Sequence, residues 1–259
     1  MRIPLFQVDA FAERVFQGNP AAVCPLESWL PDATMQALAA ENNLSETAFF
    51  VGRDGAYEIR WFTPLTEVDL CGHATLASSH VIFRHLGFAG EAIRLSSKSG
   101  PLVVRRDGEL LVLDFPARPP EPRADDPILA EALGRKPREV WMARDPVAVF
   151  GEEDEVRTLR PDSSKLAALG TFGVMVTAPG REVDFVSRYF APAEGIPEDP
   201  VTGAAHCTLV PFWSRRLGKT RLHARQVSAR GGELWCVDRG ARVEIAGRAV
   251  TYLVGTVEL

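Results

Sequence analysis

The sequence predicts an α+β protein built from two similar halves, each a curved, mostly antiparallel sheet or barrel around a central helix. Three observations predict this fold. Motifs recur in the same order about half a chain apart, each half contains the same succession of strands and helices, and a Pro-rich stretch at 116–127 lies between them. We place the first half at 1–117 and the second at 118–259, and a last strand at 250–259 can pack with the first half.

Five pairs of motifs make up the internal duplication. The separation within a pair lies between 126 residues, from Asn19 to Asp145, and 131 residues, from Arg84 to Arg215. Pro and Gly punctuate any α/β chain, so one match carries little weight, but the shared order and near-constant spacing favour a repeat. The pairs are Asn19-Pro20-Ala21-Ala22-Val23 with Asp145-Pro146-Val147-Ala148-Val149, Pro31-Asp32 with Pro161-Asp162, Arg60-Trp61-Phe62-Thr63-Pro64 with Arg188-Tyr189-Phe190-Ala191-Pro192, Cys71-Gly72-His73-Ala74 with Thr202-Gly203-Ala204-Ala205, and Arg84-His85-Leu86-Gly87 with Arg215-Arg216-Leu217-Gly218.

Each half is expected to open with a strand and to continue into a helix that starts at an aspartate. Asp32 and Asp162 are the expected N-caps of these helices. Alternating apolar residues predict the strands before and after them. The expected strands are 3–11, 48–51, 57–62, 92–95, 102–106 and 109–115 in the first half, and 140–149, 173–178, 182–189, 222–227, 232–237 and 241–245 in the second.

A second helix in each half, at 72–87 and at 203–218, is expected to be largely buried because its apolar residues lie on most sides. Pro211 should kink the later helix or end it early. Each helix begins at a glycine, where unpaired N–H groups and a partial positive charge can bind a carboxylate. The starts at Gly72 and Gly203 therefore form either an anion site in a cleft between the halves or two ordinary buried helix ends.

Composition restricts the class of ligand. The net charge of −5 gives no basic surface for nucleic acid or for a membrane, and no apolar run approaches the roughly 20 residues of a membrane helix. The first residues lack the apolar core of a signal peptide, and the four cysteines show no CxxC spacing. We therefore expect a cytoplasmic protein with reduced thiols, no zinc site and a small-molecule substrate.

Glu46 is the strongest candidate for chemistry. It lies between a helix and an apolar strand, and the comparable stretch of the second half, 167–173, contains no acid. The scaffold therefore does not need a carboxylate there, which favours a role in proton transfer, although a cap or a local ion pair is the alternative. His73 can equally be a core histidine, and Asp199, which precedes Pro200, can equally be a turn residue.

At these residues the sequence resembles the PhzF-like family of phenazine-biosynthesis isomerases. The matching blocks cover essentially the whole chain, and together they are highly specific. They are Val8-Asp9-Ala10-Phe11, Gly18-Asn19-Pro20-Ala21-Ala22-Val23, Asn43-Leu44-Ser45-Glu46-Thr47, Cys71-Gly72-His73-Ala74-Thr75 and Glu198-Asp199-Pro200-Val201-Thr202-Gly203.

The resemblance implies the diaminopimelate-epimerase fold, a homodimer and no cofactor. It implies that Glu46 is the catalytic glutamate and that His73 and Asp199 assist it. The substrate-binding positions that it implies are Asn19, Ser45, Gly72, Thr202, Gly203 and Ala204. Many relatives have Ser at the position of Ala204, so one hydroxyl contact is absent. Related epimerases use two facing cysteines as bases. Here only Cys71 matches one of them, and Thr202 stands at the partner position, which disfavours a two-thiol racemase.

The leading hypothesis is therefore an isomerase in which Glu46 shifts a proton on a small, carboxylate-bearing substrate in the cleft. An epimerase or racemase with Glu46 on one face and Cys71 or His73 on the other is the runner-up. A non-catalytic small-molecule binding protein is the third reading, because fold does not fix function. The environment of Glu46 separates this last reading from the enzymes, since a binder would leave the carboxylate pointing into solvent.

Overall fold

The computed structural model describes all residues, 1–259, and the chain divides into two compact units. One unit contains Met1–Asp114 together with Ala246–Leu259, and the other contains Phe115–Ile245. The sequence placed this boundary at 117/118, a few residues later. The end of the chain belongs with the first unit because β18 (Ala249–Glu258) pairs antiparallel with β1 (Arg2–Ala10) along almost its whole length.

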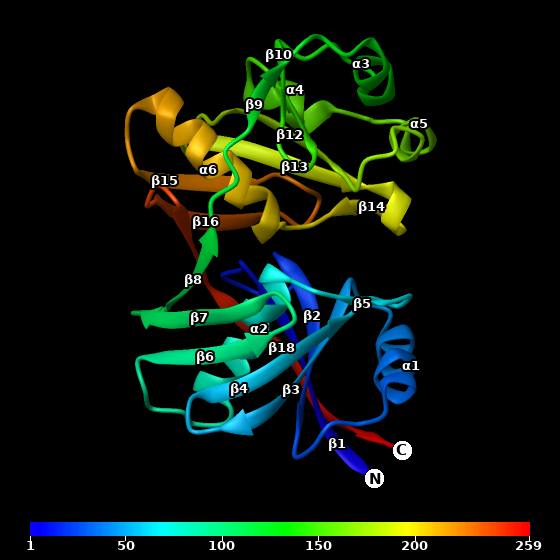
Figure 1. The fold of residues 1–259 in the computed structure, drawn as a ribbon, viewed down its shortest axis with the longest axis vertical. Coiled ribbons are helices and arrows are strands. Elements are labelled where there is room, and N and C mark those ends of the chain that lie inside the picture. The colour runs from blue at the N-terminus through cyan, green and yellow to red at the C-terminus, as the bar shows by residue number, and fades with distance from the viewer. The chain divides into compact units, whose positions relative to one another are not determined.

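The first unit is a mixed sheet in the order β18-β1-β2-β3-β4-β6-β7-β8, with β5 on β4 (Figure 1). Two pairs, β2–β3 and β4–β6, are parallel, and the rest are antiparallel. The remaining bounds are β2 Asn19–Leu26, α1 Asp32–Asn42, β3 Glu46–Arg53, β4 Ala56–Phe62, β5 Glu67–Val68, α2 Gly72–Arg84, β6 Ala92–Ser97, β7 Gly100–Asp107 and β8 Leu110–Pro116.

The second unit repeats this arrangement. Its strands pair in the order β9-β10-β11-β12-β13-β15-β16, with β14 on β13, and the parallel pairs β11–β12 and β13–β15 are the counterparts of β2–β3 and β4–β6. The bounds are β9 Glu121–Arg123, α3 Pro127–Leu133, β10 Glu139–Met142, β11 Pro146–Val149, α4 Glu153–Thr158, α5 Ser163–Ala167, β12 Val174–Pro179, β13 Phe185–Ala191, β14 Ile196–Asp199, α6 Gly203–Leu217, β15 Arg221–Gln226, β16 Gly232–Asp238 and β17 Arg242–Gly247, and a 3-10 turn spans Pro192–Glu194.

The two central helices are buried as predicted. α2 packs against β1, β2, β3 and β18, and all but two of its residues are buried, while α6 packs against β15 and β16 (Figure 1). Pro211 does not end α6 early, since the helix is continuous from Gly203 to Leu217, and the kink that is the other predicted outcome stays a prediction. A proline removes one helical hydrogen bond, but the carbonyl of Cys207 that loses it accepts instead from the backbone N–H of Arg118, at 2.8 Å.

Two local predictions fail for identifiable reasons. Asp32 does not cap α1, because Pro31 holds the N-cap position and the Asp32 carboxylate accepts from Arg60 Nη1 at 2.8 Å. Asp162 does cap α5, and its side chain accepts from the N–H groups of Ser164 and Lys165. The expected strand 140–149 is a hairpin of β10 and β11, and Asp145 lies in the turn between them.

None of the helices is both long and apolar enough to cross a membrane.

Candidate active site

Glu46 is the first residue of β3 and is placed there by a short, defined turn. Helix α1 ends at Asn42, and the left-handed backbone of its C-cap residue Asn43 (φ 49°) reverses the chain. β3 then enters the sheet beside β2, with Glu46 opposite Ala21 in parallel register. The Glu46 side chain is only 14% exposed, so the carboxylate does not point into bulk solvent.

His73 lies in the first turn of α2 and meets Glu46. Its Nε2 is 3.1 Å from Glu46 Oε2, and its side chain is 5% exposed. The contact is short enough for an ion pair, but neither atom has a well-aligned hydrogen-bond partner. Both atoms therefore keep hydrogen-bonding capacity for a third group.

The other ring nitrogen of His73 is held by two neighbours. Asn19 Nδ2 lies 3.1 Å and Cys71 Sγ 3.5 Å from Nδ1. Asn19 is fully buried at the start of β2, directly after Gly18, whose left-handed backbone allows a close approach that a Cβ would block at 2.0 Å from Ala10 O. Asn19 therefore orients the imidazole, and its predicted direct contact with substrate stays a prediction.

Charge and burial determine how these groups ionise. Burial raises the pKa of the Cys71 thiol to about 11, and the nearby Glu46 carboxylate adds to this, so Cys71 is a neutral thiol near pH 7. Burial alone would lower the pKa of His73, but the negative partners Cys71, when ionised, and Glu46 outweigh it and raise the pKa well above its ordinary value. With Cys71 neutral, Glu46 is the charge that favours a protonated His73.

Glu46, Cys71 and His73 also form a group of possible metal ligands, with their ligand atoms within 4.8 Å of one another. The thiol and the carboxylate, however, approach different nitrogens of the same ring. Ligands of one ion converge on a single point, whereas this row of acid, imidazole and thiol is the geometry of a proton relay.

The second unit has its own cluster at the start of α6. Asp199 ends β14, and its Oδ2 accepts a 2.5 Å hydrogen bond from Thr202 Oγ1. Gln226 holds the turn: its Oε1 accepts from Thr202 N at 2.9 Å, and its Nε2 donates to Asp199 O at 2.8 Å and to Thr202 Oγ1 at 3.1 Å. Sequence reasoning missed Gln226, although a polar residue on the inward, apolar face of the alternating strand 222–227 was a usable signal.

Both central helices begin without a side-chain cap. Cys71 and Thr202 hold the N-cap positions of α2 and α6, and neither side chain accepts from its helix, since the Thr202 hydroxyl is engaged with Asp199 and Gln226. Two short helices of the second unit do have side-chain caps, α3 from Asp126 and α5 from Asp162. The N–H groups at Gly72 and Gly203 are therefore available to an anion.

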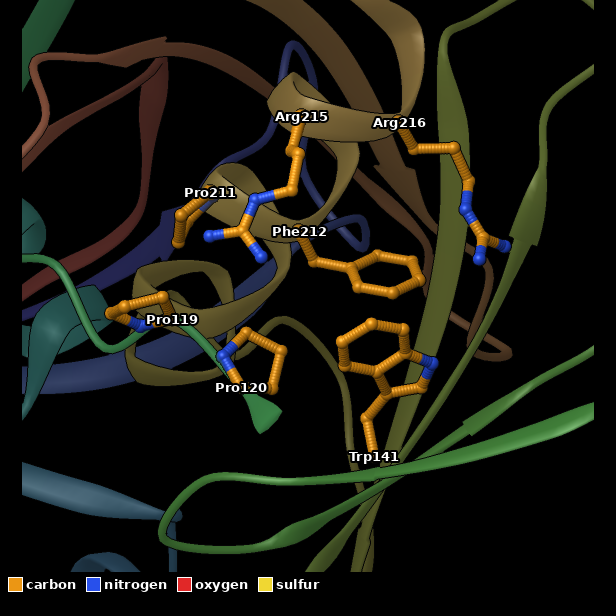
Figure 2. Close-up of a pocket in the computed structure, with 7 residues that line it drawn as sticks. All are labelled: Pro119, Pro120, Trp141, Pro211, Phe212, Arg215 and Arg216. Atoms are coloured by element: carbon orange, nitrogen blue, oxygen red, sulfur yellow. The ribbon is translucent and has the colours of Figure 1, made fainter. Parts of the chain in front are cut away.

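The last two predicted substrate-binding residues, Ser45 and Ala204, make no side-chain hydrogen bonds in either cluster. Both are half-buried. A pocket of about 140 Å³ in the second unit, lined by Pro119, Pro120, Trp141, Pro211, Phe212, Arg215 and Arg216, contains none of the predicted site residues (Figure 2).

Comparison with known proteins identifies the family. The sequence pattern of the phenazine biosynthesis-like proteins (PhzC-PhzF) matches residues 8–255. The chain is 54% identical to an uncharacterized isomerase of Pseudomonas aeruginosa over the full length of both proteins. It is 38% identical to the human phenazine biosynthesis-like domain-containing protein, covering 99% of each chain.

Solved structures agree with this family match. A PhzF-family protein from Enterococcus faecalis superposes with a TM-score of 0.98 at 50% identity over all of both chains. A hydroxyproline epimerase from Agrobacterium vitis, with a TM-score of 0.62 at 11% identity over 99% of this chain and 92% of its own, shares the fold. The predicted fold class is thus confirmed, and the chain belongs to the phenazine biosynthesis-like family and is an isomerase.

Proposed function

We propose that this isomerase shifts a proton on a small, carboxylate-bearing substrate without a cofactor and that Glu46 is the general acid and base. The 3.1 Å contact between Glu46 Oε2 and His73 Nε2, whose side chains are 14% and 5% exposed, is the observation that carries the proposal. Asp199, Thr202 and the helix start at Gly203 are proposed substrate-binding residues of the second unit.

The proposed steps use only side chains of this protein. The Glu46 carboxylate takes a proton from a carbon of the substrate and becomes a carboxylic acid, and the electron pair of the broken C–H bond moves into the substrate as an enolate or its extended form. The uncapped N–H groups at the start of α2 stabilise this negative charge. Glu46 then returns the proton to a different carbon, which completes the isomerisation and regenerates the carboxylate.

His73 has a supporting role in this scheme. An N–H on its Nε2, 3.1 Å from Glu46 Oε2, stabilises the carboxylate form between turnovers. His73 can also pass a proton to the substrate through Nε2, the ring nitrogen that faces Glu46. Asn19, on the opposite side of the ring, keeps Nε2 directed at the acid.

The test is exchange of substrate hydrogen with solvent. A panel of cyclic and open-chain amino and hydroxy acids, including trans-4-hydroxy-L-proline, is incubated with the protein in D₂O and followed by NMR and mass spectrometry. Wild type should incorporate deuterium into its substrate, and Glu46→Gln should slow this about 10² to 10⁴-fold while leaving binding intact. Glu58→Gln, an exposed acid on β4, is the matched control. Near wild-type exchange by Glu46→Gln would refute the assignment.

The epimerase alternative has one observation in its favour, the position of Cys71 beside His73 Nδ1. A thiol with a pKa of about 11 is a poor base near neutral pH but can act as a proton donor. If deuterium enters the same carbon that lost a proton, with inverted configuration, and Cys71→Ser abolishes this, the epimerase reading is correct. A shifted double bond with retained Cys71→Ser activity supports the isomerisation.

A further inference from the structure

The second unit contains, at the place equivalent to Glu46, a cluster that the proposed reaction does not use. The strand registers align the two halves: Thr47 lies opposite Phe62, and Val174 lies opposite Phe190, its counterpart in the repeat. Glu46 therefore corresponds to Gly173. A Cβ on Gly173 would lie 2.4 Å from Tyr189 Oη, so the Tyr189 hydroxyl takes the space that a side chain would need.

This hydroxyl is part of a buried network. Tyr189 Oη donates to Asp145 Oδ2 at 2.9 Å, and Asp145, the counterpart of Asn19, is only 2% exposed. The same Oδ2 accepts from Arg144 Nε at 3.0 Å and from Arg144 Nη2 at 2.7 Å, and Nη2 also reaches Tyr189 Oη at 3.1 Å. Where the first unit has a titratable acid and imidazole, the second has an arginine fixed by three hydrogen bonds.

Arg144 is fixed on one side and open on the other. Its guanidinium carbon lies 4.5 Å from the ring centre of Phe172, which orients the group by stacking. Its side chain is 46% exposed, Phe172 is 45% exposed, and Nη1 has no hydrogen-bond partner. Asp145 Oδ1 is buried and also lacks a partner. The cluster thus offers one charged donor and one acceptor next to an exposed aromatic face.

The cluster also lies close to the start of α6. Tyr189 pairs directly opposite Asp199 in the β13–β14 ladder, so their side chains share a face of the sheet. Asp199 in turn holds Thr202, the N-cap residue of α6. Arg144 is close enough to favour the ionised form of Cys207, one turn into the same helix. A guanidinium therefore supplements the N–H groups that the uncapped helix leaves open.

We propose that Arg144 binds a planar carboxylate in the second unit, with Asp145, Tyr189 and Phe172 as the residues that position it. This inference goes beyond the proposed function, because it assigns a carboxylate site from contacts within the second unit alone. Since Asp145 cancels most of the long-range field of Arg144, recognition depends on the directed hydrogen bond from Nη1 and on stacking beside Phe172. The site selects planar carboxylates over neutral compounds of the same shape.

The experiment compares benzoate with benzamide, its neutral analogue, by NMR-detected titration of the intact protein. Wild type should bind benzoate at least tenfold more tightly than benzamide. Arg144→Gln should bind both equally, Arg144→Lys should keep a reduced preference, and Asp145→Asn, which keeps the cation but loosens it, should also reduce the preference. Arg157→Gln is the matched control, because Arg157 is an ion-paired, similarly exposed arginine of the same unit.

Two results would overturn the inference: equal binding of benzoate and benzamide by wild type, or an unchanged preference in both Arg144 variants with wild-type thermal unfolding. The benzoate experiment tests Arg144 independently of the role proposed for Glu46. Glu46→Gln should keep the benzoate preference, whereas the Glu46 assignment is judged by deuterium exchange alone. If the wild-type protein exchanges deuterium but binds benzoate and benzamide equally, the role of Arg144 is refuted and the role of Glu46 is not.

Discussion

Two buried histidines show how strongly the immediate neighbours of a residue set its chemistry. His73 and His206 both lie near the start of a central helix, and burial disfavours the charged form of each. His73 lies beside Cys71 and Glu46, and the negative charge of these two groups when ionised raises its pKa well above the ordinary value. His206 faces only a neutral group, the carbonyl of Thr202 at 2.8 Å, and its pKa falls to about 4. The neighbours at the two helix starts thus move the pKa of a buried histidine in opposite directions.

The His206 environment makes stability dependent on pH. The unfolded chain takes up a proton near pH 6.5, but the folded protein does so only near pH 4, so the unfolded state binds more protons between these values. Stability should therefore be complete above pH 6.5 and fall as the pH drops toward 4, by about 3 kcal/mol for this group. Urea unfolding of wild type and His206→Gln between pH 7 and pH 4 measures the effect. His206→Gln should show a shallower loss, and parallel curves for the two proteins would contradict it.

At the scale of elements, the central helices depend on residues from other strands for their open starts. A helix start without a cap would normally be unfavourable when buried, because its N–H groups lack acceptors. In the second unit Gln226 from β15 accepts a hydrogen bond from Thr202 N and donates one to Thr202 Oγ1. The turn is therefore held in place, while the first N–H groups of α6 have no side-chain cap. The turn is thus held from β15 and not by the helix itself.

Replacement of Gln226 should affect both stability and turnover. Gln226→Leu leaves Thr202 N and Asp199 O without their partners, which should cost about 1–3 kcal/mol in unfolding free energy. It also removes the hydrogen bond that Thr202 Oγ1 accepts, while the one that Oγ1 donates to Asp199 stays, so the turn before α6 is held less firmly and deuterium exchange should fall. The matched control is Gln36→Leu in the first unit, which loses a single hydrogen bond to Thr63 O. Unchanged exchange in a Gln226→Leu protein that is less stable would limit Gln226 to a structural role.

The sequence predicted best those elements whose signal repeats. The central helices followed from motifs present in both halves, whereas Glu46 stood out because the comparable stretch of the second half, 167–173, contains no acid. Strand β2 was not predicted, because Pro20 and Pro25 interrupt it and its interior is continuously apolar rather than alternating. Arg144 was missed because a half-exposed arginine has no sequence pattern, and its significance lies in contacts with Asp145 and Tyr189 that only the folded chain creates.

At the scale of the whole molecule, the two units differ in how the chain builds them. The second unit is one continuous segment, Phe115–Ile245, with a core of its own that includes Leu133, Phe150 and Phe190. The first unit is discontinuous, because β18 returns from the end of the chain to pair with β1. Leu259 N donates to Met1 O at 2.8 Å, so the two termini of the protein are neighbours.

This difference predicts which fragments fold. The segment 115–245 should fold alone and unfold cooperatively, because it retains its core and all of the strand pairs from β9 to β16. The segment 1–114 should not fold alone. It lacks β18, which is one of the two strands that pair with β1 and which also packs against α2. Circular dichroism and urea unfolding of the two purified segments measure this.

A permuted first unit provides the decisive control. Joining residue 259 to residue 1 through a short Gly/Ser linker gives the continuous order 246–259, linker, 1–114, and the contact between the termini shows that a few residues suffice to span the join. This permutant should regain cooperative unfolding that 1–114 lacks. If 1–114 already folds as well as the permutant, β18 is dispensable and the stability of the first unit lies in its remaining strands and α2. If neither folds, the first unit requires the second.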